Sequence, residues 1–158
     1  MTAIHKTEVL TRSLKAPVSR VFAAWADPEA RLSWGTPGPS IELKHSATDF
    51  SEGGQDIALC VADGAQVAEV YTRYIDIRTD ARIVMSEVIE GGGTRFGASL
   101  VTAEFEAEGE GCRLVVTLQT VALDGSGLEA DVIEGWTSAL EMLERFVAAP
   151  VQSVSRLT

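Results

Sequence analysis

LEADVIEGWTSALEMLERFV, residues 128–147, is the stretch of the chain that decides the fold. Its apolar side chains recur every three or four residues, and they are Leu128, Val132, Trp136, Leu140, Leu143 and Val147. This spacing places them on one face of an α-helix, with acidic residues on the other face. We predict an amphipathic helix of about twenty residues, roughly 30 Å long, which is enough to cross a small sheet. Ala148, Ala149 and Pro150 should end it.

The preceding residues, 40–121, have the two-residue period of β-strands, interrupted by turn signals rich in Gly and Asp. Six strands joined by hairpins fit this spacing. In the last hairpin three cross-strand pairs are predicted on one face: Phe105 with Leu114, Ala103 with Val116, and Val101 with Leu118. The same register sets Glu106 opposite Arg113, so one face of the hairpin is buried and the other is wet.

The N-terminal part adds one strand and two short helices. Residues 7–14 alternate in polarity as a strand does, and Pro17 opens a helix that runs to Ala26. A second helix over about residues 29–34 ends at the Gly- and Pro-rich residues 35–39.

The length of the chain is that of a single domain. We expect its 158 residues to form one domain over residues 1–150, followed by a frayed C-terminal tail over residues 151–158. No uncharged apolar run reaches the ~18–20 residues that cross a bilayer, so membrane insertion is not expected. The N-terminus also lacks the apolar region of a signal peptide.

Charge and cysteine content exclude further classes of function. The chain carries 23 acidic and 13 basic side chains, and its net charge of -10 disfavours nucleic acid and anionic membrane surfaces as partners. Cys60 and Cys112 are too few for a disulfide framework and lie in apolar segments. We therefore expect reduced thiols and a cytoplasmic protein.

Three short motifs in the N-terminal part narrow the fold. They are VSRVF at residues 18–22, ADPE at residues 26–29 and WGTP at residues 34–37. In this order they resemble the signature of the group named after the activator of the heat-shock-protein-90 ATPase, within the START-like, birch-pollen-allergen-like (SRPBCC) superfamily. The resemblance covers about residues 7–147.

The resemblance implies an α+β helix-grip fold. In that fold a curved antiparallel sheet of about seven strands wraps around the long C-terminal helix, and two short helices follow the first strand. Relatives in the superfamily include lipid carriers, hormone receptors, polyketide cyclases and chaperone co-factors. The resemblance therefore implies a cavity but no single function.

A sheet curled around one helix leaves a space that is either filled by side chains or hollow. The candidate wall residues are Val101, Ala103, Phe105, Leu114, Val116 and Leu118 from the last hairpin, and Trp136, Leu140 and Leu143 from the helix. Each of them either packs in the core or contacts a ligand, and core packing is the more common outcome for an apolar stripe. A hollow of ~300 Å³ or more would favour ligand binding.

A hairpin in the middle of the sheet carries the best polar candidate. A four-residue loop over residues 78–81 pairs Tyr74 with Met85. The same register pairs Thr72 with Glu87, whereas a loop longer by one residue would turn one strand over. Glu87 then faces inward among apolar side chains, where its carboxyl must find a donor or keep its proton. With Tyr74 as partner it is a candidate ligand-binding residue; the alternative is an exposed or salt-bridged Glu87.

Two further positions have two interpretations each. Trp34, beside the loop expected to flank the cavity mouth, is either a gate or a hydrophobic plug. The strand over residues 55–62 turns one of two sets toward the cavity: Asp56, Ala58 and Cys60, or Ile57, Leu59 and Val61.

The sequence contains no pattern typical of a catalytic constellation. His5 and His45 lie on separate predicted strands and lack metal-ligand spacing. The Gly-rich turns lack the lysine or the strand-to-helix context of a phosphate loop. We therefore expect no metal and no cofactor, and we favour a binding role over an enzymatic one.

The resulting hypothesis is a domain that binds a small hydrophobic or amphipathic molecule between the sheet and the C-terminal helix. One alternative is a co-chaperone-like regulator of a chaperone ATPase, which the family resemblance implies. Another is a polyketide-cyclase-like enzyme that uses Glu87 as acid or base. A homodimer through an exposed strand edge or helix is also compatible with the sequence.

Overall fold

The structure is a computed structural model that describes residues 2–36 and 38–149. The predicted tail over residues 151–158 lies outside the described residues. The elements follow in the order β1 (Ile4–Leu14), α1 (Val18–Ala26), α2 (Pro28–Trp34), β2 (Ile41–Ala47), β3 (Gln55–Ala62), β4 (Ala65–Arg78), β5 (Arg82–Gly91), β6 (Thr94–Glu108), β7 (Gly111–Ala122) and α3 (Leu128–Ala148). This is the element order predicted from the sequence.

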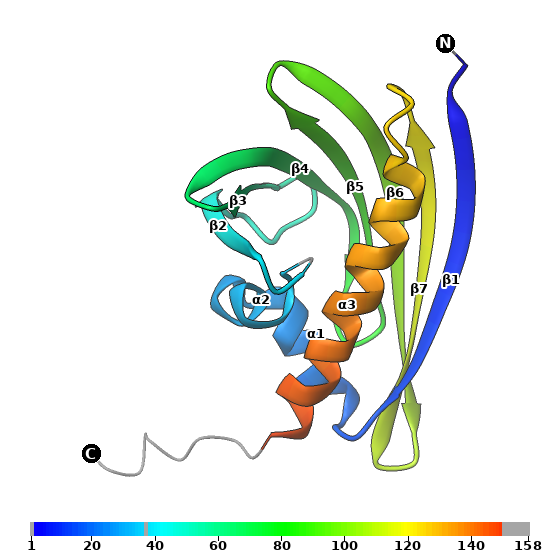
Figure 1. Cartoon of the computed structure of the whole chain (residues 1–158). Helices are drawn as coiled ribbons and strands as arrows, with labels where there is room; N and C mark the ends of the chain where they lie inside the picture. The colour runs from blue at the N-terminus through cyan, green and yellow to red at the C-terminus, as the bar shows by residue number, and fades with distance from the viewer. Residues whose placement is uncertain (1, 37, 150–158) are drawn as a thin grey trace.

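One seven-stranded antiparallel sheet carries the fold, with its strands in the order β1-β7-β6-β5-β4-β3-β2. The sheet is strongly curved, and α3 lies along its inner side (Figure 1). Because β1 pairs with β7, the first strand of the chain lies beside the last one, and β2 forms the opposite edge. The α+β helix-grip fold is thus confirmed. Among the described residues, no helix is long and apolar enough to cross a membrane.

The two short helices are set by a single boundary residue. Asp27 ends α1, where its backbone N–H donates to the Ala23 carbonyl, and it is also the N-cap of α2. Its side chain accepts a hydrogen bond of 3.0 Å from the backbone N–H of Glu29. Pro28 follows at the first helical position, which suits its fixed φ and missing N–H. The chain therefore turns sharply here and brings α2 toward β2 and α3.

The predicted register of the β6–β7 hairpin is confirmed. The observed partners include Phe105 with Leu114, Ala103 with Val116, and Val101 with Leu118, and Glu106 lies opposite Arg113. The inward-facing members are 6% exposed or less. On α3 the predicted apolar face is buried at Leu128, Val132, Leu140, Leu143 and Val147, whereas Trp136 is only half-buried. The core thus lies between α3 and the β6–β7 side of the sheet.

The central hairpin has the predicted pairs but not the predicted loop. Tyr74 pairs with Met85, and Thr72 pairs with Glu87. The loop spans only residues 79–81, since Arg78 already pairs with Arg82, so the four-residue loop was wrong. A β-bulge between Tyr74 and Asp76 inserts one extra residue and restores the predicted register beyond it.

A substitution at Gly97 tests how tightly the sheet packs under the start of α3. A β-carbon at Gly97 would overlap the Val121 carbonyl oxygen and lie 2.6 Å from Cδ2 of Leu128. We expect Gly97→Ala to lower the free energy of unfolding by about 1–3 kcal/mol, as measured by urea denaturation. Gly38→Ala is the control, because a β-carbon there meets nothing within 4 Å. Equal stability of the two variants would contradict this packing.

Candidate functional site

A cavity lies between the β2–β5 side of the sheet, α2 and α3, and is partly open to solvent. Its volume is about 260 Å³, slightly below the ~300 Å³ at which ligand pockets usually begin. The wall is mostly apolar. The space exists because the side chains on this part of the inner sheet face are small. They are Ala58, Cys60, Ala68, Val70 and Thr72. On β3 the inward set is therefore Asp56, Ala58 and Cys60, which resolves the choice that the sequence left open.

The structure divides the eleven predicted site residues into two groups. Five line the cavity: Trp34, Tyr74, Met85, Glu87 and Trp136. The other six lie outside its wall, in solid core: Val101, Ala103, Phe105, Val116, Leu118 and Leu140. The reason is the position of α3, which packs directly against β1 and β7 and fills that half of the sheet. The cavity therefore lies in the β2–β5 half.

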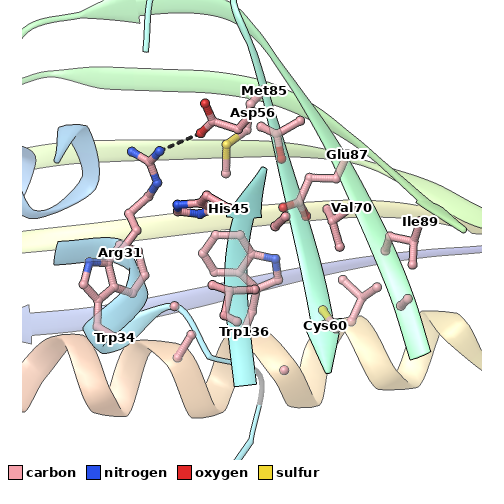
Figure 2. A pocket seen from close by; sticks show the side chains of 18 of the residues that line it. Arg31, Trp34, His45, Asp56, Cys60, Val70, Met85, Glu87, Ile89 and Trp136 are labelled. Carbon is pink, nitrogen blue, oxygen red and sulfur yellow. Dashed lines mark hydrogen bonds and ion pairs between the residues drawn. The ribbon is translucent and has the colours of Figure 1, made fainter. Parts of the chain in front are cut away.

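Sequence reasoning missed a buried polar cluster at one end of the cavity. Asp56, only 4% exposed, accepts hydrogen bonds from Arg31 Nη2 at 2.6 Å, from the Tyr74 hydroxyl at 2.6 Å and from the Asp49 backbone N–H at 2.8 Å. Figure 2 shows the ion pair reaching from α2 to β3. Arg31 also donates through Nη1 to the Trp25 carbonyl at 2.6 Å. The sequence feature that could have indicated this cluster is Asp56 itself, an acidic residue in the largely apolar strand β3.

The cluster strongly shifts the titration of Tyr74. Burial raises the pKa of Tyr74 well above its usual value, and the hydrogen bond to Asp56 adds to that rise, while the Arg31 charge opposes it. Tyr74 therefore stays a neutral donor. Since Asp56 already accepts three hydrogen bonds, its charge is compensated within the protein.

Glu87 reaches into the same cavity from β5 and has fewer hydrogen-bond donors around it than Asp56 has. Burial raises the pKa of Glu87 to about 7, and a hydrogen bond from the Trp136 indole lowers it only in part. Figure 2 shows the carboxyl and the indole nitrogen turned toward each other. Among the described residues, none of the ion pairs includes Glu87. The inward-facing Glu87 expected from the sequence is thus present, with Trp136 rather than Tyr74 as its polar neighbour.

Two further titratable side chains in the wall are neutral near pH 7. Burial and the Arg31 charge lower the pKa of His45, against the opposing charges of Asp56 and Glu29. Burial, followed by the Glu87 charge, raises the pKa of the Cys60 thiol. Within the part of the chain that the structure describes, no three His, Cys, Asp or Glu side chains are grouped as metal ligands.

Aromatic rings form the boundary between cavity and core. Trp136 stacks on Trp25 with ring centroids 5.5 Å apart and an interplanar angle of 18°. The Trp34 ring centroid lies 5.1 Å from that of Trp25, and Trp34 is 2% exposed. Its indole N–H donates to the Ala24 carbonyl at 2.9 Å. These contacts fix the ring at the end of α2, and they favour the hydrophobic plug over the gate as the prediction for Trp34.

Comparisons with known proteins agree on the fold. Residues 15–148 match the family model described as "Activator of Hsp90 ATPase homolog 1-like protein". A solved structure of a protein from Rhizobium leguminosarum is 35% identical with a TM-score of 0.82, covering 93% of this chain and 97% of that one. A protein from Rhizobium loti is 30% identical with a TM-score of 0.82, covering 92% and 99%. No curated protein matches the chain.

The pKa of Glu87 makes stability depend on pH. The folded-state pKa of about 7 lies above the ordinary value of 4.5, so the folded protein holds the Glu87 proton more tightly than the unfolded chain does. The stability gained in this way is fully present below about pH 4.5 and is lost as pH rises through about 7. Glutamine does not titrate, so the Glu87→Gln variant keeps its stability over this range. As pH rises from about 4.5 to about 7, its unfolding free energy should increase by about 2–3 kcal/mol relative to that of the unchanged protein. Urea denaturation at a series of pH values measures this gain, and parallel stability curves for the two proteins would contradict it.

The Asp56 cluster predicts a large cost for losing one buried charge. Asp56→Asn leaves Arg31 buried beside an uncharged amide, and we expect unfolding free energy to fall by about 3–5 kcal/mol. The matched control is Asp76→Asn, which removes an equally short Asp–Arg pair at 2.7 Å whose side chains are 36–40% exposed. Its loss should be much smaller because solvent screens that pair. Thermal denaturation compares them, and equal losses would show that burial adds nothing.

Proposed function

Because the chain belongs to the family of activator of Hsp90 ATPase homolog 1-like proteins, we propose that it binds a small hydrophobic or amphipathic molecule in the cavity between β2–β5 and α3. The observation that carries this proposal is the cavity of about 260 Å³ itself. A close-packed interior rarely leaves voids larger than a water molecule, and an apolar hollow of this size costs stability when it is empty.

The wall of the cavity supports this proposal. Apolar side chains such as Val70, Met85 and Ile89 would bury a ligand's hydrophobic surface, which contributes about 25 cal/mol for each Å² removed from water. Its buried carboxyls stand at two places, Asp56 at one end and Glu87 beside Trp136, and Asp131 lies at an exposed position of the wall. Few polar groups in an apolar wall are typical of sites that orient a small ligand. The volume favours a compact ligand.

The two alternatives remain predictions. A role as a chaperone regulator draws its support from the family's description alone. A catalytic role would use Glu87, since a carboxyl with a pKa of about 7 can exchange protons near neutral pH. Cys60 supplies no activated nucleophile, because burial raises the pKa of its thiol.

Filling the cavity from β3 tests the proposed function. Ala58 lines the cavity, so the ring in Ala58→Phe would occupy the ligand's space. The matched control is Leu59→Phe, because neighbouring strand residues point to opposite faces of the sheet. With 1-naphthol as the probe, we expect saturable binding to the unchanged protein and to Leu59→Phe, and an affinity at least about tenfold weaker for Ala58→Phe.

Two readouts check this prediction. Titration of 1-naphthol fluorescence gives the dissociation constants, and native mass spectrometry shows whether a small molecule co-purifies with each protein. A co-purified molecule should be retained by Leu59→Phe and lost from Ala58→Phe. The proposal fails if all three proteins bind 1-naphthol equally, or if none binds it and none retains a molecule.

A further inference from the structure

The charged side chains of the cavity wall do not balance. Asp56, Glu87 and Asp131 line it, against Arg31 as the one Lys or Arg among the described lining residues. Arg31 is committed to Asp56, with Nη2 at 2.6 Å from Oδ2. Burial and the Arg31 charge lower the pKa of His45, so His45 supplies no second cation near pH 7. The cavity is therefore acidic, as is the whole chain with its net charge of -10.

Of the acidic side chains in the wall, Asp56 is ion-paired and Asp131 is exposed, and Glu87 is the one that faces inward without an ion-pair partner among the described residues. Its neighbours come from four elements: Thr72 on β4 and Ser99 on β6 lie opposite it, the Cys60 thiol senses its charge from β3, and the Trp136 indole faces it from α3. All four are neutral. No ion pair of Glu87 exists within residues 2–36 and 38–149. A carboxylate in such a setting is costly unless a cation joins it.

Aromatic faces around the same space favour a cation as well. Trp136 lies beside Glu87, and Phe50 and Tyr74 line the cavity with ring centroids 4.9 Å apart. The face of an aromatic ring attracts an ammonium group, most strongly where water is excluded. An uncharged polar ligand could form only a hydrogen bond with the Glu87 carboxyl, whereas an ammonium group gains from both the negative charge and the ring face.

We infer that the ligand is a compact hydrophobic amine, bound as its ammonium ion with the nitrogen paired to the Glu87 carboxylate and the apolar body against Val70, Met85 and Ile89. This inference rests on the proposed function, because it identifies the chemical class of the molecule in the same cavity. The Asp56 end of the cavity plays no part in recognising the charge, since its carboxylate is already paired.

An ammonium ligand and a neutral ligand should exchange protons in opposite directions when they bind. Near pH 7 part of the Glu87 population is protonated, and an ammonium ligand would displace that proton, so binding should release protons and tighten as pH rises toward about 8. A neutral ligand that accepts a hydrogen bond from the protonated carboxyl would instead take up protons and weaken. The other titratable groups that line the cavity are His45, Cys60, Tyr74, Asp131 and the paired Arg31 and Asp56.

Three probes with one apolar skeleton test the inference: 2-phenylethylamine, 2-phenylethanol and 3-phenylpropanoic acid. Isothermal titration calorimetry near pH 7, in two buffers with different ionisation enthalpies, gives affinity and proton exchange together. We expect the amine to bind at least about tenfold more tightly than the alcohol, with proton release, and the acid to bind least. These comparisons use the unchanged protein, so they do not depend on how any variant folds.

Two variants that remove one negative charge each separate direct contact with the ligand from the overall electrostatic field. Glu87→Gln should weaken amine binding about tenfold and leave alcohol binding within about twofold. Glu134→Gln, at an exposed position of α3 outside the cavity wall, should change neither by more than about twofold. Proton uptake, or alcohol binding as tight as amine binding, overturns the inference and leaves the proposed function standing. If neither these probes nor 1-naphthol bind, both fail.

Discussion

The buried carboxylate of Asp56 is the interaction on which the shape of the cavity depends. It ties together parts of the chain that are distant in sequence, because Arg31 comes from α2, Tyr74 from β4 and the Asp49 N–H from the segment before β3. Helix α2 also packs against α1, α3 and β2, and these bonds add a link from α2 to β3 and β4. A charge buried at 4% exposure is stable only because all three donors arrive together. The cluster therefore fixes where the cavity ends.

The position of the hollow follows from side-chain size along the two halves of the sheet. On β6 and β7 the inner face carries Phe105, Leu114 and Leu118, all buried. Phe105 packs against Phe22 and Trp25 of α1, and α3 packs against β1 and β7, so the two helices together close that half. On β3 and β4 the inner face carries Ala58 and Ala68, which are too short to reach α3. One helix cannot touch both halves of the strongly curved sheet that Figure 1 shows. The half with short side chains therefore keeps the cavity.

Local patterns in the sequence predicted most of the fold, because helix and strand periods are properties of neighbouring residues. The pairing of Thr72 with Glu87 was right even though the loop was wrong, since a bulge after Tyr74 offset the shorter loop. The wall of the cavity was predicted on the wrong half of the sheet for residues such as Val101 and Val116. Which half α3 fills depends on long-range packing, and periodicity contains no information about it.

Asp56 and Glu87 show how one cavity gives two carboxyls different roles. Asp56 accepts three hydrogen bonds from its own chain, one of which is also the ion pair with Arg31, so no charge remains there for a ligand to satisfy. Glu87 forms no ion pair within the described residues, the Trp136 indole is its hydrogen-bond donor, and burial raises its pKa to about 7. A buried carboxyl that is hydrogen-bonded within the protein stabilises the fold. A buried carboxyl with few partners can instead gain free energy by pairing with a ligand. Selectivity in this cavity should therefore come from Glu87, and rigidity from Asp56.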